Sequence, residues 1–318
     1  MLLINYRKIF RSVLSGRDSL QEGELNMQNA LNTELSMKLK DSRQLGFVEY
    51  GEPHGKPILF FHGLAGSRLD ARLLHKIAIT NHCRLISIDR PGMGLSSFDK
   101  KRTILSWADD VEAFADHFNL PKFAIIGHSG GAPFVAACLY KIPERLTGAA
   151  IVSGMGPFEL PAATASLTRG QRFLNSVIRK LPWIATCCMK LTSWMFKNPS
   201  MLKQGLKQMA QVDSHILQSE VNNEVLGATL METFRQGVAG AAQEMQLTLK
   251  PWGFNLGDIK ATCPITVWHG GLDKQAPAIH AELYAQLIPN AKLSFFKQEG
   301  HLSLLVNKGE DILQSITI

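Results

Sequence analysis

The five residues Gly127-His128-Ser129-Gly130-Gly131 constrain this chain more than any other stretch. They stand between a short apolar run, residues 123–126, and a helix-like run, residues 132–140. A serine at such a tight strand-to-helix turn adopts strained backbone geometry, so its hydroxyl projects above the sheet. Pro133 fits the first turn of the following helix, where its missing N–H is not needed. This context favours a reactive Ser129 over an ordinary Gly-Ser turn.

Together with this turn, three other parts of the chain carry a resemblance to a known family. They are Phe60-Phe-His-Gly63, Asp89-Arg-Pro-Gly-Met-Gly-Leu-Ser96, and the pair His269-Gly-Gly-Leu-Asp273 and Glu299-Gly-His301. Their order, nucleophile then acid then histidine, is that of the α/β-hydrolase family, which the chain resembles from about Gln44 to its C-terminus. The resemblance implies an α/β fold with a mostly parallel central sheet, helices on both faces and a helical cap insertion.

The resemblance also implies the residues of a catalytic site. Ser129, Asp273 and His301 correspond to a Ser-Asp-His triad, and the backbone N–H groups of Leu64 and Gly130 to an oxyanion hole. The pattern of the chain agrees, because Asp273 follows an apolar run at the carboxyl end of a predicted strand, the edge where parallel sheets bind ligands.

Other polar residues near these motifs are interpreted as structural. Asp89 and Arg90 precede Pro91-Gly92, and an aspartate there readily accepts hydrogen bonds from turn N–H groups and pairs with a neighbouring cation. Lys274 and His280 hold no position that the mechanism requires, and we expect both at the surface.

The remaining pattern predicts an alternation of strands and helices. Strands are expected at residues 44–50, 57–61, 84–88, 123–126, 148–152, 264–268 and 292–296, and helices at 68–80, 107–118, from 132 to about 143, and from about Ser303. The alternation stops between Pro157 and Met245.

Three parts of the chain are therefore expected. Residues 1–40 form an N-terminal extension, mobile or partly helical, of which 15–39 would serve as a tether. Residues 41–156 and 246–318 form the hydrolase core, and residues 157–245 form the helical cap. The cap is rich in methionine and large aromatic residues, and we expect some to line a substrate cavity and most to pack the cap itself. They are Met189, Met195, Met201, Met209, Met231, Met245, Phe173, Trp183, Trp194 and Phe196.

The composition of the chain indicates which classes of partner and cofactor to expect. The formal charge of +7 comes from scattered lysines and arginines without a basic stripe, which argues against nucleic-acid binding. Five cysteines do not resemble a secreted disulfide framework, and no stretch is long enough to span a bilayer, so we expect a cytoplasmic protein. Helical spacing of Leu3, Tyr6 and Phe10 leaves weak peripheral membrane contact as an alternative. No cofactor and no metal are expected, since cysteines and histidines lack ligand spacing.

The leading hypothesis is hydrolysis of an ester or related bond of a small apolar acyl compound through an acyl-serine intermediate. One alternative is a prolyl-type aminopeptidase, which would need cap carboxylates to hold a substrate ammonium. The candidates are Glu220, Glu224, Glu232 and Glu244, which we expect instead to be solvated faces of helices. A second alternative is a non-catalytic receptor that binds a small ligand in the same pocket. Dehalogenase chemistry is disfavoured because the turn carries Ser129, not aspartate.

Overall fold

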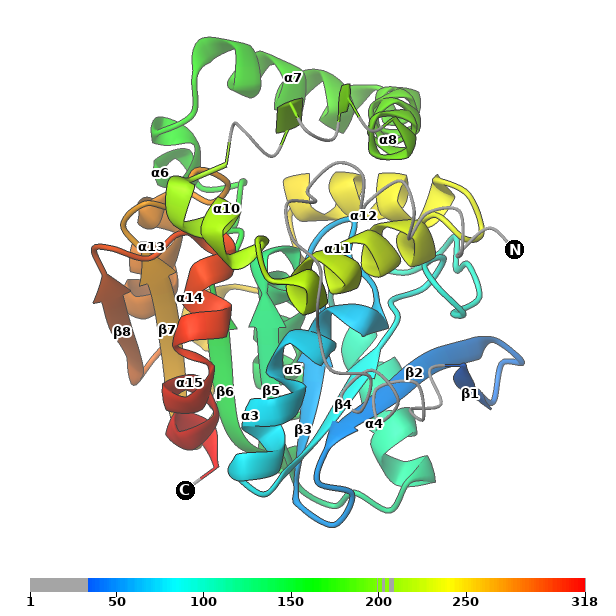
Figure 1. The fold of residues 1–318 in the computed structure, drawn as a ribbon, viewed down its shortest axis with the longest axis vertical. Coiled ribbons are helices and arrows are strands. Elements are labelled where there is room, and N and C mark those ends of the chain that lie inside the picture. The colour runs from blue at the N-terminus through cyan, green and yellow to red at the C-terminus, as the bar shows by residue number, and fades with distance from the viewer. Residues whose placement is uncertain (1–33, 199, 202–203, 206–208, 318) are drawn as a thin grey trace.

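The fold is built on one twisted sheet flanked by helices (Figure 1). The computed structural model describes residues 34–198, 200–201, 204–205 and 209–317. The eight strands lie in the order β1-β2-β4-β3-β5-β6-β7-β8. Their bounds are β1 Leu35–Lys38, β2 Gln44–Gly51, β3 Lys56–Phe61, β4 Cys83–Ile88, β5 Phe123–His128, β6 Leu146–Val152, β7 Ile265–Gly270 and β8 Ala291–Phe296.

Strands β3 to β8 run parallel, whereas β2 pairs antiparallel with β4 and β1 antiparallel with β2. The central strands are continuous apolar runs because both of their faces are covered, as in parallel sheets generally. All six residues of β5 are buried. This strand therefore lies in the middle of the core, and its carboxyl end positions Ser129.

Two helical layers cover the sheet. Helices α4 Trp107–His117, α5 Ala132–Lys141 and α13 Ala278–Leu287 pack on one face, where Trp107, Phe114 and Tyr284 join a large apolar cluster. Helices α3 His75–Thr80, α14 His301–Asn307 and α15 Gly309–Ile316 pack on the other face, in front of the strands in Figure 1. Successive strand residues alternate between the two clusters, since side chains of a strand point to opposite faces.

Between β6 and β7 the chain forms a series of helices that lie above the carboxyl ends of the strands (Figure 1). We call residues 157–245 the helical insertion. Its helices are α6 Pro161–Ala165, α7 Arg169–Lys180, α8 Pro182–Lys197, α10 Gln211–Ile216, α11 Glu220–Thr233 and most of α12 Ala239–Leu249. In the part of the chain described here, no helix is both long and apolar enough to cross a membrane.

The seven predicted strands are all present, with ends that differ by a few residues at most. The predicted helix at 68–80 is a 3-10 helix, η1 Arg68–Leu74, followed by α3. One expectation was wrong: the predicted tether includes β1, whose Met37 is buried, as is Leu39 just beyond it. The alternation of Leu35, Met37 and Leu39 places apolar side chains on one face of an edge strand. The prediction for residues 1–33 lies outside the described residues.

Candidate active site

Ser129 lies at the sharp turn between β5 and α5, in a short 3-10 turn, η2 Ser129–Gly131. Its φ is +53°, in the left-handed region that non-glycine residues rarely occupy. The flanking glycines are required by close packing: a Cβ on Gly127 would lie 2.7 Å from the carbonyl oxygen of Gly131, and one on Gly131 would lie 2.2 Å from that of Phe61. The backbone therefore holds Ser129 in this strained geometry at the cavity wall.

His301 and Asp273 meet beside the same cavity. Asp273 follows β7 and His301 is the first residue of α14, and their side chains are 0% and 6% exposed. The Nδ1 of His301 lies 2.7 Å from Oδ2 of Asp273, while Oδ1 of Asp273 accepts from the backbone N–H groups of Gln275 at 2.7 Å and Ala276 at 2.9 Å. With Nδ1 donating to the carboxylate, Nε2 is the ring atom left to accept a proton.

The pKa values of Asp273 and of the neighbouring His128 depend on burial and on the groups that contact them. Burial alone would raise the pKa of the Asp273 carboxyl, but the hydrogen bond and charge of His301, with the N–H groups of Ala276 and Gln275, outweigh it and hold the pKa below its ordinary value. Burial, and secondly the charge of His301, lowers the pKa of His128 to about 3. His128 is therefore neutral at physiological pH, and its Nε2 lies 3.2 Å from the carbonyl oxygen of His301.

Leu64 and Gly130 lie side by side. A Cβ on Gly130 would lie 2.5 Å from the backbone nitrogen of Leu64, so only glycine allows this approach. Gly130 is in the first turn after β5, where N–H groups have no acceptor within the helix. The structure thus brings together all five residues that the sequence singles out.

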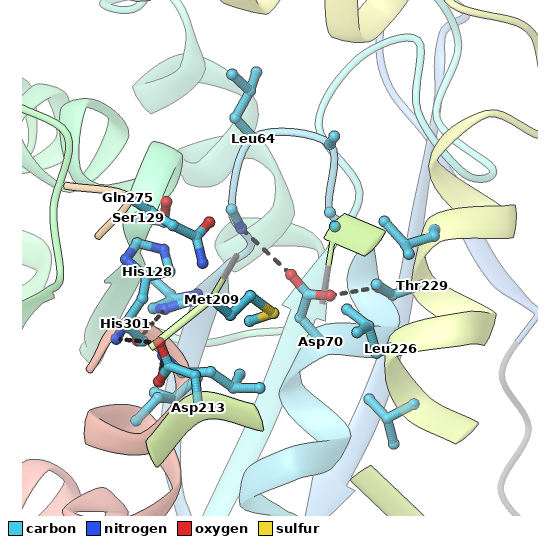
Figure 2. A pocket seen from close by; sticks show the side chains of 18 of the residues that line it. Leu64, Asp70, His128, Ser129, Met209, Asp213, Leu226, Thr229, Gln275 and His301 are labelled. Carbon is cyan, nitrogen blue, oxygen red and sulfur yellow. Dashed lines mark hydrogen bonds between the residues drawn. The ribbon is translucent and has the colours of Figure 1, made fainter. Parts of the chain in front are cut away.

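A cavity of about 470 Å³ opens in front of Ser129 (Figure 2). Its lining combines residues of the β3–η1 loop, α14 and the helical insertion, among them Met195, Phe196, Met201 and Met209. The expectation that some methionines line a cavity therefore agrees with the structure. We also expected most of these residues to pack the insertion itself. That expectation was wrong for Phe173, Trp183 and Trp194, whose exposed fractions are 71%, 60% and 53%.

Sequence reasoning missed Asp213. This residue of α10 is 1% exposed, and its carboxylate accepts from three backbone N–H groups: those of His301 at 3.0 Å, Leu302 at 2.9 Å and Ser303 at 2.9 Å. It thus caps the N-terminus of the helix that begins with His301. Gly300 makes room for it, since a Cβ there would lie 2.5 Å from Oδ1 of Asp213. No local signal could have found this contact, which joins residues 88 positions apart.

Asp89, Arg90 and Glu244 form buried ion pairs close to the site. Asp89 accepts from Arg68 Nη1 at 2.7 Å and from the N–H of Leu95 at 2.9 Å, so the structural interpretation of Asp89 agrees with the geometry. Arg90 is fully buried, and its Nε donates to Glu244 at 2.7 Å. The expectation that Glu244 is solvated was wrong, because it also pairs with Arg102 and is 0% exposed.

The other candidate carboxylates of the insertion are also engaged where the structure describes them. Glu232 pairs with Arg68 at 2.7 Å and Arg235 at 3.1 Å, and Glu224 with Arg72 at 4.0 Å. The side chain of Glu220 lies outside the described residues. Each of these contacts reduces the capacity to hold a substrate ammonium.

Two further expectations are settled by burial. Lys274 is exposed, as expected. His280 is 1% exposed, so its assignment to the surface was wrong; its Nε2 lies 2.9 Å from the carbonyl oxygen of Ala163, which fixes α6 against α13.

Within the described ranges, no three or more His, Cys, Asp or Glu residues are grouped as a metal site would require, and the five cysteines are free thiols.

Comparison with known proteins agrees with the fold. The family model described as "alpha/beta hydrolase fold" matches residues 56–308. A hydrolase from Pseudomonas aeruginosa is similar in structure, with a TM-score of 0.64 at 19% identity, over 90% of this chain and 98% of that chain.

Two curated relatives are similar in sequence. Ethanol acetyltransferase 1 of Kluyveromyces marxianus is 27% identical over 145 residues, 45% of this chain. The dihydrolipoyllysine-residue acetyltransferase component of the acetoin cleaving system of Cupriavidus necator is 26% identical over 259 residues, 80% of this chain. The matched regions cover 39% and 62% of these two relatives.

Proposed function

The chain belongs to the alpha/beta hydrolase fold family, and from that premise we propose that it is a serine hydrolase that cleaves a carboxylic ester or related acyl compound. The observation that carries this proposal is the convergence at one cavity of a strained Ser129 and of His301, whose Nδ1 lies against Asp273. These are the parts that a nucleophilic acyl-transfer mechanism needs.

In the proposed mechanism, Nε2 of His301 takes the hydroxyl proton of Ser129 as Oγ attacks the substrate carbonyl. Asp273 holds the ring in the tautomer with hydrogen on Nδ1 and stabilises the imidazolium as it forms. The tetrahedral oxyanion is held by the N–H groups of Leu64 and Gly130, each worth roughly 100- to 1000-fold in rate. His301 then protonates the leaving group, and water, activated by the same base, releases the acid from Ser129.

The helical insertion is proposed to act as a cap that sets substrate size. Side chains from it and from α14 line an apolar wall of the cavity. Each methylene that enters such a wall gains up to about 0.8 kcal/mol, so kcat/KM is expected to rise up to about fourfold per methylene until the cavity is full. Medium-length acyl esters are therefore expected to be better substrates than acetyl esters.

The test is covalent labelling with a fluorophosphonate. The wild-type protein is expected to be labelled on Ser129, and Ser129→Ala to be unlabelled, because in the proposed mechanism His301 activates Ser129. Ser166→Ala, which changes an exposed serine of the helical insertion, is the matched control and is expected to label like wild type. Absence of labelling on folded wild-type protein would favour the receptor hypothesis.

A second candidate is acyl transfer to an alcohol in place of water. It is favoured by the name of one relative, an ethanol acetyltransferase; the other relative is named as an acetyltransferase with a different acceptor. The acyl-serine intermediate is common to both reactions, and only the acceptor differs. The two reactions are distinguished by supplying an acyl donor in water with added ethanol and measuring, by chromatography, how much acid and how much ethyl ester is formed.

The aminopeptidase alternative is less favoured because Glu224, Glu232 and Glu244 are engaged by arginines.

A further inference from the structure

Asp70 is a carboxylate on the cavity wall that the proposed mechanism does not use. It belongs to η1, directly after the loop that carries Leu64, and lines the same cavity as Ser129. Its Oδ2 accepts from the N–H of Gly63 at 3.4 Å, and its Oδ1 accepts from the hydroxyl of Thr229 on α11. Figure 2 shows Asp70 between the Leu64 loop and α11, across the cavity from His301.

The charge of Asp70 is not balanced by an ion pair. Among the described residues, the buried acids Asp89 and Asp110 pair with Arg68 and Arg43. The buried carboxylate of Asp213 instead accepts from three backbone N–H groups. Within residues 34–317, as far as the structure describes them, no cation forms an ion pair with Asp70, and the neighbouring Arg72 lies against Glu224. Burial raises the pKa of Asp70 to about 6, offset in part by the hydrogen bonds from Thr229 and Gly63 and by the charge of Arg90, which makes no ion pair with it.

Asp70 also keeps acceptor capacity. An ionised carboxylate has about four lone-pair sites, and three donors face Asp70: the hydroxyl of Thr229 and the N–H groups of Gly63 and Ser67. A buried polar group without its full set of partners is costly, and proteins keep such groups mainly at functional sites. Asp70 and Ser129 line the same cavity of about 470 Å³, so a small molecule bound at Ser129 can reach Asp70.

We propose that Asp70 is a specificity-determining residue that accepts a hydrogen bond from a hydroxyl or ammonium group of the substrate, away from the bond that is cleaved. The proposal rests on the proposed hydrolase function and names its substrate class: acyl compounds that carry a hydrogen-bond donor on an otherwise apolar chain. Substrates that end in a carboxylate or phosphate are disfavoured because their charge repels Asp70.

The experiment compares matched esters with and without a donor. In the acyl arm, p-nitrophenyl hexanoate is compared with its 6-hydroxy and 6-amino derivatives. In the alcohol arm, butyl butyrate is compared with 4-hydroxybutyl and 4-aminobutyl butyrate. We expect the wild type to prefer a donor-bearing ester by about tenfold or more in kcat/KM in at least one arm, because hydrogen bonds to charged groups are the stronger ones. The hydroxyl and amino members distinguish the two donors.

Two variants separate recognition from support of the fold. Asp70→Asn removes the charge and one of the two acceptor oxygens, so it is expected to bring the ratio of kcat/KM between donor-bearing and donor-free esters toward one. Leu226→Ala, which enlarges the same cavity without touching the carboxylate, is expected to change rates on all esters alike and to keep the preference. A wild type without donor preference in both arms, or a preference that is undiminished in Asp70→Asn, overturns the proposal.

A binding measurement keeps the test independent of catalysis. Thermal unfolding of Ser129→Ala is followed with hexylamine, 1-hexanol and hexyl methyl ether, of which only the ether lacks a donor. A larger stabilisation by the amine or the alcohol that is reduced in the double variant with Asp70→Asn supports the proposal even if Ser129 is never labelled. Equal stabilisation by all three compounds contradicts it, whatever the labelling shows.

Discussion

Replacement of Asp70 by asparagine is expected to stabilise the protein at neutral pH. The pKa of this carboxyl is raised from 3.8 to about 6, chiefly by burial. A shift of about 2 pKa units corresponds to about 3 kcal/mol by which folding disfavours the ionised form. Part of the carboxylate faces the cavity, and the new amide group also needs an acceptor, so we expect a net gain of about 1–2 kcal/mol in the free energy of unfolding at pH 7.5.

The sign of the pH dependence follows from the direction of the shift. The pKa of Asp70 is higher in the folded than in the unfolded protein, so the folded state binds the proton more tightly. Its contribution to stability is fully present below pH 3.8 and is lost as pH rises through about 6. Asparagine does not titrate. The advantage of Asp70→Asn is therefore expected to be small near pH 4 and complete by pH 7.5.

Urea unfolding of both proteins at pH 4.5 and pH 7.5, followed by intrinsic fluorescence, measures the difference. All other titrating groups are shared and cancel in the comparison. Asp258→Asn, which removes an exposed carboxylate, is the control and is expected to change stability little at either pH. A less stable Asp70→Asn at pH 7.5, or a difference that is the same at both pH values, refutes the reasoning that this carboxylate is held at a cost.

Three further outcomes are expected. Asp273→Asn should keep the fold and lower kcat by roughly 10⁴-fold, by analogy with the Ser-His-Asp proteases; near-normal turnover in steady-state assays would mean that the acid lies elsewhere. Asp213→Asn should lower kcat at least about tenfold with little change in KM, because an amide offers one acceptor oxygen to three N–H groups, with partial rescue by Asp213→Glu; a rise in KM as large as the fall in kcat would argue for a merely structural role. Glu244→Gln should destabilise the protein by about 3–5 kcal/mol in thermal unfolding, since it leaves two buried arginines uncompensated; a change under about 1 kcal/mol would show that water reaches them.

Local signals explain what the sequence predicted well. The turn at Ser129 is specified by its own glycines and by the apolar run before it, so strand, turn and helix are visible within 20 residues. Asp273 and His301 each follow a strand, and parallel strands bring their carboxyl ends to one edge. The central strands were predictable for the same reason, because their uninterrupted apolar runs reflect burial on both faces.

Tertiary contacts explain what was missed. Glu244 lies on a helix whose pattern is typical of a solvated face, but the arginines that bury it come from residues 90 and 102. Asp70 and Asp213 look like ordinary surface acids in sequence, and their roles depend on Thr229 and on the start of α14, far along the chain. Burial of His280 depends on Ala163 in the same way. Sequence patterns report local periodicity, whereas the environment of a single side chain depends on the whole fold.

The hydrogen bonds of Asp213 have a consequence for protein engineering. Exchange of the insertion between relatives is an obvious route to new substrate selectivity, and α10 is part of the insertion. A transplanted segment without an equivalent carboxylate would leave three N–H groups at the start of α14 without acceptors, each at a cost of about 1–3 kcal/mol. Such a chimera is expected to fold with a displaced His301 and to lose turnover on every substrate. Grafts should therefore keep residues 211–216 from the recipient, and Gly300 with them.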